Sequence, residues 1–109
     1  MLLSDYQKQS RRTAVYPNAG SDIYYPTLGL ASEAGEVAGK VKKVLRDNNG
    51  KMTDERRIEL KAELGDVLWY VAQLATELGF DLDEVASENL DKLFSRQDRG
   101  VLQGSGDNR

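Results

Sequence analysis

The chain has 109 residues, of which 39% are hydrophobic and 30% are charged, as is typical of one small globular domain. It contains no cysteine and no histidine, which excludes disulfides, thiolate metal sites, a cysteine nucleophile and an imidazole base. The formal net charge of −3 argues against duplex nucleic acid as the main partner, because duplex binding requires a basic face.

The residue types that remain restrict the chemistry of the chain. Any acid–base or metal chemistry must use carboxylates, lysines or tyrosines, and oxygen ligands favour hard cations such as Mg²⁺, Mn²⁺ or Ca²⁺. The N-terminus lacks the basic start and apolar run of a signal peptide. No stretch approaches the roughly 18 apolar residues of a membrane span. We therefore expect a cytoplasmic protein without a membrane partner.

Two helices are predicted in the first half of the chain. Residues 4–13 form a short polar segment that is expected to be helical, and residues 14–25 contain Pro-Asn and Gly-Ser pairs typical of a loop. Pro26 suits the first turn of a longer helix, which ends at the stop signal Asp-Asn-Asn-Gly of residues 47–50. Apolar residues recur along it at helical spacing: Leu30, Ala34, Val37, Val41 and Val44.

Two further helices follow the stop signal. Thr53 is expected to cap a helix that runs to about Leu78, where Gly79 ends it. Asp81 is expected to start a last helix that runs to about Arg96. The apolar seam of the first of these helices comprises Leu60, Leu64, Val67, Val71, Leu74 and Leu78. Because no segment alternates like a strand, the predicted fold class is all-α, a small bundle of about four helices.

The predicted domain spans residues 1–98, and the glycine-rich residues 99–109 are expected to form a flexible tail. The helix of residues 54–78 is apolar on its far side as well, most notably at Trp69. A helix that is apolar on two sides is buried on two sides, so we expect oligomerisation to complete the bundle, with Trp69 at the interface. Coverage of Trp69 by residues 4–13 of the same chain is the alternative.

Each long helix also carries acidic residues beside its apolar seam. At about 100° per residue, Glu33 and Glu36 share one stripe. On the next helix the stripe comprises Glu59, Glu63, Asp66, Tyr70, Gln73 and Glu77. Glu36 and Glu63 lie equally far from the turn in sequence, and so do Glu33 and Asp66. An antiparallel pair closed at that turn would bring these four carboxylates together about 20 Å from it, at a rise of about 1.5 Å per residue.

Clustered carboxylates repel one another, at about 4 kcal/mol per pair of charges about 4 Å apart at an effective dielectric of about 20. A small domain has only about 5–15 kcal/mol of net stability, so such a cluster must be protonated, solvated or bound to a metal. A divalent cation answers the repulsion most directly, and Mg²⁺ held by carboxylates keeps positions open for water and substrate phosphates. The alternative is that these acids form solvated faces of surface helices.

The acidic pairs and the sequence around them resemble the MazG-like nucleoside triphosphate pyrophosphohydrolases, within the all-α NTP pyrophosphatase superfamily. The family pattern is E-x-x-E, a spacer, then E-x-x-D, and here it reads Glu33-x-x-Glu36 and Glu63-x-x-Asp66. The similarity covers residues 25–96. It implies an enzyme, a hydrolase that cleaves between the α and β phosphates of a nucleoside triphosphate and releases the monophosphate and pyrophosphate.

The resemblance also implies roles for individual residues. The four carboxylates of the motif are expected to hold Mg²⁺, with Mn²⁺ as an alternative, and one of them is expected to take the proton of the attacking water. The expected substrate contacts are Tyr70, Asn89, Lys92 and Arg96. Apart from the resemblance, base recognition is expected from the loop of residues 14–25, with a neighbouring subunit as a further source, and Tyr16, Tyr24 and Tyr25 either stack on the base or pack internally.

Two classes of function remain open on the sequence alone. The leading prediction is an enzyme that hydrolyses nucleoside triphosphates, deoxynucleotides included, for sanitation or control of the nucleotide pool. The resemblance implies that it forms a homodimer or homotetramer. The alternative is a non-catalytic helical module whose acidic groove binds a basic partner or a divalent cation.

Overall fold

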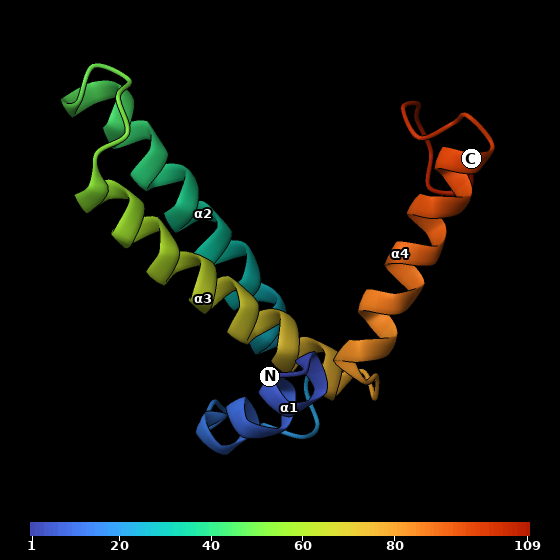
Figure 1. Ribbon diagram of the computed structural model, residues 1–109. Helices are drawn as coiled ribbons and strands as arrows, with labels where there is room; N and C mark the ends of the chain where they lie inside the picture. The colour runs from blue at the N-terminus through green and yellow to red at the C-terminus, as the bar shows by residue number, and fades with distance from the viewer.

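The computed structural model describes residues 1–109 and is built from helices alone, which confirms the predicted all-α class. Figure 1 shows α2 and α3 running side by side as a long antiparallel pair, with α1 across its base and α4 leading away. The elements are α1 Leu3–Ser10, the short 3₁₀ helix η1 Arg11–Thr13, α2 Tyr24–Asp47, α3 Asp54–Glu77 and α4 Leu82–Asp98. No helix has the length and apolar character needed to cross a membrane.

The turn between α2 and α3 fixes the register of the pair. Asn49 and Gly50 adopt left-handed backbone conformations with φ of 55° and 76°, which asparagine and glycine tolerate best. The Gly50 amide donates to the Val44 carbonyl at 3.0 Å and closes the end of α2. The Thr53 hydroxyl accepts from the Arg56 amide at 3.1 Å and starts α3, as its sequence position predicts.

A glycine in the first part of α2 allows the close approach of α3. A Cβ atom added to Gly29 would lie under 3.0 Å from the ring of Tyr70. The aromatic ring therefore occupies the space that any other side chain at position 29 would need. This contact sets where Tyr70, a predicted substrate contact, lies between the helices.

Gln7 fastens α1 to the junction of α3 and α4. Its side-chain amide donates to the Thr76 hydroxyl at 3.0 Å and to the Phe80 carbonyl at 2.9 Å. Its side-chain oxygen accepts from the Leu82 amide at 2.8 Å. One side chain thus satisfies the end of α3, the intervening turn and the start of α4, which orders groups that helix ends otherwise leave unpaired.

The chain is far from compact. Its radius of gyration is 16.8 Å, whereas about 13 Å is usual for a domain of this length. It exposes 7855 Å², which exceeds the surface of a typical folded monomer of this mass by roughly 1,800 Å². Figure 1 shows the reason, since α4 diverges from the α2–α3 pair instead of packing along it.

The apolar seam predicted for α3 is only partly buried, which corrects the sequence-based expectation. Leu64 is 59% exposed and Leu78 is 51% exposed, while the buried cluster consists of Ala72, Ala75 and Leu82 near the base of the molecule. The spacing identified residues suited to burial, but α4 does not cover them. Other large apolar side chains are exposed on all three long helices: Leu28, Leu45, Leu68, Val85, Leu90 and Phe94.

The C-terminal residues fold back beside the end of α4. Arg109 donates to the carbonyls of Val101, Leu102 and Gly106 at 2.7–2.9 Å. The Arg96 side chain donates to the Asp107 carbonyl. The last helix ends at Asp98, while the domain boundary after residue 98 and the mobility expected of residues 99–109 stay predictions.

Replacing Gly29 with alanine is expected to lower the free energy of unfolding by about 1–3 kcal/mol, because the methyl group overlaps the Tyr70 ring. Urea unfolding followed by circular dichroism measures the change. Gly39→Ala is the matched control, since no atom beyond the local backbone of α2 lies within 4 Å of that added Cβ, and it is expected to be neutral or stabilising by up to about 1 kcal/mol. Equal effects of the two substitutions would contradict the close approach.

Candidate metal and nucleotide site

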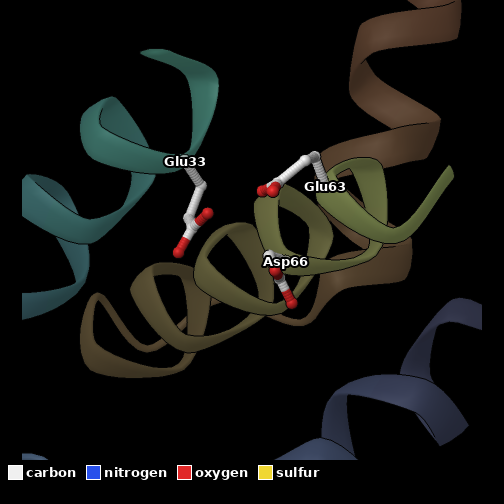
Figure 2. A group of neighbouring side chains, drawn as sticks. All are labelled: Glu33, Glu63 and Asp66. Atoms are coloured by element: carbon white, nitrogen blue, oxygen red, sulfur yellow. The ribbon is translucent and has the colours of Figure 1, made fainter. Parts of the chain in front are cut away.

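Three of the four motif carboxylates meet where α2 faces α3. Glu33 of α2 and Glu63 and Asp66 of α3 each offer an oxygen, and these oxygens all lie within 4.8 Å of one another. Figure 2 shows Glu33 and Glu63 extending toward each other from the two helices, with Asp66 further along α3. The antiparallel register expected from the sequence therefore brings these acids together.

The polar atoms of this cluster are incompletely satisfied. Lys40 Nζ lies 3.6 Å from Glu63 Oε1 and partly balances its charge. The other oxygen, Glu63 Oε2, is buried and has no hydrogen-bond partner. Desolvation raises the pKa of Glu33, and the neighbouring carboxylates Glu63 and Asp66 raise it further.

These observations fit a hard divalent cation. A buried carboxylate oxygen without a donor is costly unless something positive approaches it, and carboxylate oxygens are the ligands that Mg²⁺ prefers. Glu36, the remaining motif acid, is exposed and lies outside the group of three. It lies on α2 one turn from Glu33 and contributes to the electrostatic field there, so its role as a ligand stays a prediction.

An aromatic cavity opens beside the acids. Glu33 and Asp66 form one side of it, and Thr13, Trp69 and Tyr70 form the rest. Trp69 packs edge-on against Tyr70, with ring centroids 5.0 Å apart. These two rings, called the aromatic wall below, lie next to the carboxylate cluster and suit a ligand that has an aromatic part and an anionic part held through a cation on the acids.

Trp69 is half-buried and contacts the N-terminal segment of its own chain. Its indole Nε1 donates to the Thr13 hydroxyl at 2.8 Å, and its ring meets Tyr16 edge-on with centroids 6.2 Å apart. The N-terminal segment therefore contacts Trp69, as the alternative expects, while a subunit interface at Trp69 stays a prediction. The sequence showed that this face of α3 is apolar but not which segment covers it.

The three tyrosines predicted to lie in a loop have different surroundings, and two of them, Tyr24 and Tyr25, belong to the first turn of α2 instead. Tyr16 is 8% exposed and stacks parallel on Tyr25, with ring centroids 5.2 Å apart. Tyr25 in turn lies 6.4 Å from the Tyr70 ring, so the two inner tyrosines support the aromatic wall. Tyr24 is 74% exposed and contacts neither ring pair.

Glu77 is a buried carboxylate that the sequence placed on the acidic stripe without assigning it a task. Its side chain is 1% exposed and accepts hydrogen bonds from the Tyr16 hydroxyl, from Arg11 at 2.9 Å and from the amides of Gly20 and Asp22. Burial alone raises the pKa of a carboxyl group, but these donors outweigh it and lower the pKa of Glu77 to about 2. Helical spacing alone could not reveal the donors, because they come from residues 11–22.

The predicted substrate residues of α4 lie away from the acid cluster of the same chain. Asn89 and Lys92 line a shallow pocket on α4 beside Phe80. Arg96 is 5% exposed because the C-terminal residues cover it. Figure 1 shows that α4 leads away from the pair of helices that carries the acids.

Comparison with known proteins identifies the family of this chain. The MazG nucleotide pyrophosphohydrolase domain matches residues 26–101, so the chain belongs to that family, whose members act on nucleotides. The Gene 37 protein of Mycobacterium phage L5 is 57% identical over 114 residues, an alignment that spans the whole of both chains. No solved structure matches the chain.

The lowered pKa of Glu77 predicts a specific acid sensitivity. Its ionised form is favoured in the folded state, so the stabilisation is complete above the ordinary carboxyl pKa of 4.5 and is lost as the pH falls toward about 2. The loss amounts to about 3 kcal/mol, at about 1.4 kcal/mol per pKa unit. Glu77→Gln is expected to unfold more easily at pH 7 and to lose less stability between pH 4.5 and 2 than the unmodified chain.

Urea unfolding at each pH measures this dependence. Glu55→Gln is the matched control, because Glu55 is exposed in the first turn of α3. An identical acid slope for Glu77→Gln and the unmodified chain would contradict the assignment.

Proposed function

We propose that this chain is a Mg²⁺-dependent nucleoside triphosphate pyrophosphohydrolase. It cleaves the α–β phosphate bond of ribo- or deoxynucleoside triphosphates and releases the monophosphate and pyrophosphate, for sanitation or control of a cytoplasmic nucleotide pool. The observation that carries this proposal is the group formed by Glu33, Glu63 and Asp66, with an unpaired buried oxygen, beside an aromatic cavity. Membership of the MazG family supports the same reaction.

In this proposal the acids bind the metal and the aromatic rings contact the organic part of the nucleotide. Glu33, Glu63 and Asp66, joined by Glu36, hold Mg²⁺, with Mn²⁺ as an alternative. The cation supplies charge neutralisation of the triphosphate and acidification of water. One of the carboxylates accepts the proton of the water whose oxygen attacks phosphorus, and the bridging P–O bond breaks as pyrophosphate leaves.

The cavity suits the organic part of a nucleotide. Trp69 and Tyr70 offer aromatic surface within reach of the carboxylates, so a base or sugar there would leave the phosphates next to the metal. Tyr70 lies between the acids and the inner aromatic rings, since it lines the cavity with Glu33 and Asp66 and its ring centroid is 6.4 Å from that of Tyr25. It is therefore the proposed contact between the nucleotide and the α3 surface.

A second copy of the chain completes the site in this proposal, as a homodimer or homotetramer. The excess exposed surface of roughly 1,800 Å² per chain is in the range that obligate interfaces bury. The side chains that α4 exposes, including Leu90 and Phe94, are apolar, and so are side chains such as Leu28, Leu64 and Leu68 that the α2–α3 pair exposes. Packing α4 of one copy along that pair of the other would bring Asn89 and Lys92 to the phosphates in trans, whereas Arg96 is covered by the C-terminal residues of its own chain.

The reaction itself gives the first test. With Mg²⁺ and a screen of ribo- and deoxynucleoside triphosphates, ³¹P NMR is expected to show pyrophosphate and monophosphate. Glu63→Gln is expected to lower the rate by a hundredfold or more, because loss of even the groups that support metal ligands costs about 10–100-fold. Glu55→Gln is expected to retain activity.

Three outcomes would contradict the proposal. Release of inorganic phosphate and a diphosphate would assign a different bond. An unaffected Glu63→Gln variant would place the reaction elsewhere. No turnover of any nucleotide would leave the alternative, a helical module whose acidic groove binds a basic partner or a divalent cation.

Mixing two inactive variants tests whether α4 acts in trans. Glu63→Gln lacks a metal ligand, and Lys92→Ala lacks a phosphate contact, so each alone is expected to be nearly inactive. Refolded together, half the dimers pair one of each, and one of their two sites combines an intact acid cluster with an intact α4. Activity is therefore expected to recover to about a quarter of the unmodified level.

If both variants are folded and their mixture recovers no activity, this result contradicts the trans arrangement. Sedimentation of the unmodified chain provides the matching physical measurement. A monomer at the concentrations of the assay would exclude a shared site.

A further inference from the structure

The hydrogen bonds of Glu77 join two segments that are far apart in the sequence. The carboxylate lies at the end of α3, and its donors come from residues 11–22, which lead from η1 to α2. Gly20 alone brings its amide to 3.1 and 2.9 Å from the two carboxylate oxygens. Glu77 thus gathers four donors from this segment, and the Trp69–Thr13 and Arg11–Gln73 hydrogen bonds join the same segment to α3.

The held segment forms the back of the aromatic cavity. Tyr16, whose hydroxyl is bonded to Glu77, stacks parallel on Tyr25 and meets Trp69 edge-on. The rings of Tyr25 and Trp69 each pack against Tyr70, with centroid distances of 6.4 and 5.0 Å. Trp69 and Tyr70 are the residues that line the cavity next to the acids, so Glu77 lies one ring behind that wall.

Arg11 also fixes the Tyr16 hydroxyl and the Glu77 carboxylate. Its guanidinium donates to the Tyr16 hydroxyl at 2.7 Å, to Gln73 Oε1 at 3.2 Å and to Glu77. Gln73 is completely buried and donates onward to the Ser10 hydroxyl at 2.8 Å. The orientation of Tyr16 is therefore fixed by a closed network of hydrogen bonds, and Glu77 is the only acid in it.

We propose that Glu77 is a positioning residue of the nucleotide pocket, which sets the aromatic wall of Trp69 and Tyr70 by fixing Tyr16 and the backbone of residues 20–22. This inference rests on the proposed function, because the pocket is assigned there to the nucleoside. Glu77 touches neither the metal ligands nor the cavity, so its effect passes through the rings. The affinity for the nucleotide then depends on the Glu77 carboxylate, whereas the rate of the chemical step at the phosphates does not.

Two variants separate positioning from folding. Glu77→Gln keeps the size of the side chain but removes its charge and replaces one acceptor by a donor. Tyr16→Phe keeps the stacked ring and removes only the hydroxyl that reaches Glu77. Glu55→Gln removes an exposed carboxylate from the same helix and serves as the control.

The expected result is a split between KM and kcat. Loss of a hydrogen bond to a charged group shifts an equilibrium by about tenfold or more, so KM is expected to rise about tenfold in both variants, with kcat within about threefold of the unmodified enzyme. The double variant is expected to have the same KM as Glu77→Gln, because both substitutions break the same hydrogen bond between Tyr16 and Glu77. The control is expected to change neither constant.

The fluorescence of Trp69 provides a readout that needs no turnover, because the chain has one tryptophan. Its emission is expected to shift to the red in Glu77→Gln and in Tyr16→Phe, as the wall loosens and admits water. If the unmodified chain hydrolyses no nucleotide, the proposed function has failed. The Trp69 emission of the variants still shows whether Glu77 fixes the position of the Trp69 and Tyr70 rings.

Several results would overturn the inference. A folded variant with unchanged KM and unchanged emission would show that the wall is independent of Glu77. A fall in kcat with unchanged KM would show a purely structural effect on the fraction of active protein. If Glu77→Gln fails to fold by circular dichroism, Tyr16→Phe decides by the same criteria.

Discussion

The pairing of α2 with α3 is the constraint on which the proposed chemistry depends. It holds Glu33 against Glu63 and Asp66 although their charges repel, and it does so through a tight turn at Asn49 and Gly50 and a contact too close for any side chain at position 29. Lys40 offsets part of the repulsion, while one oxygen of Glu63 remains without a partner. The packing energy of the helices thus maintains a site that is electrostatically ready for a cation.

A second feature is that a single chain leaves many large apolar side chains exposed. The buried apolar cluster is small, and its residues lie near the base where α1, α3 and α4 meet. Polar side chains fasten that region, with Gln7 joining three elements and Glu77 holding the segment before α2. The long helices above it expose leucine, valine and phenylalanine. Both the stability and the proposed substrate contacts of α4 are therefore expected to depend on association with another copy.

Local signals in the sequence predicted most of the fold. The cap at Thr53, the turn at residues 47–50 and the acidic spacing all act over a few residues, so pattern and register were enough to place three of the four acids. The hydrogen-bond partner of Trp69, the donors to Glu77 and the direction of α4 depend on contacts between distant segments. Helical periodicity shows that a face is apolar or acidic but not what meets it. The same limit explains why Leu64 was expected in the core and is exposed in a single chain.

The melting temperature with and without Mg²⁺, at matched ionic strength, tests the central claim most directly. A cation that binds only the folded cluster stabilises it by mass action, so near-saturating Mg²⁺ is expected to raise Tm by more than about 5 °C. Glu63→Gln is expected to abolish this rise, and Glu55→Gln is expected to retain it. An unchanged Tm at saturating Mg²⁺, or an equal rise in Glu63→Gln, would contradict the account.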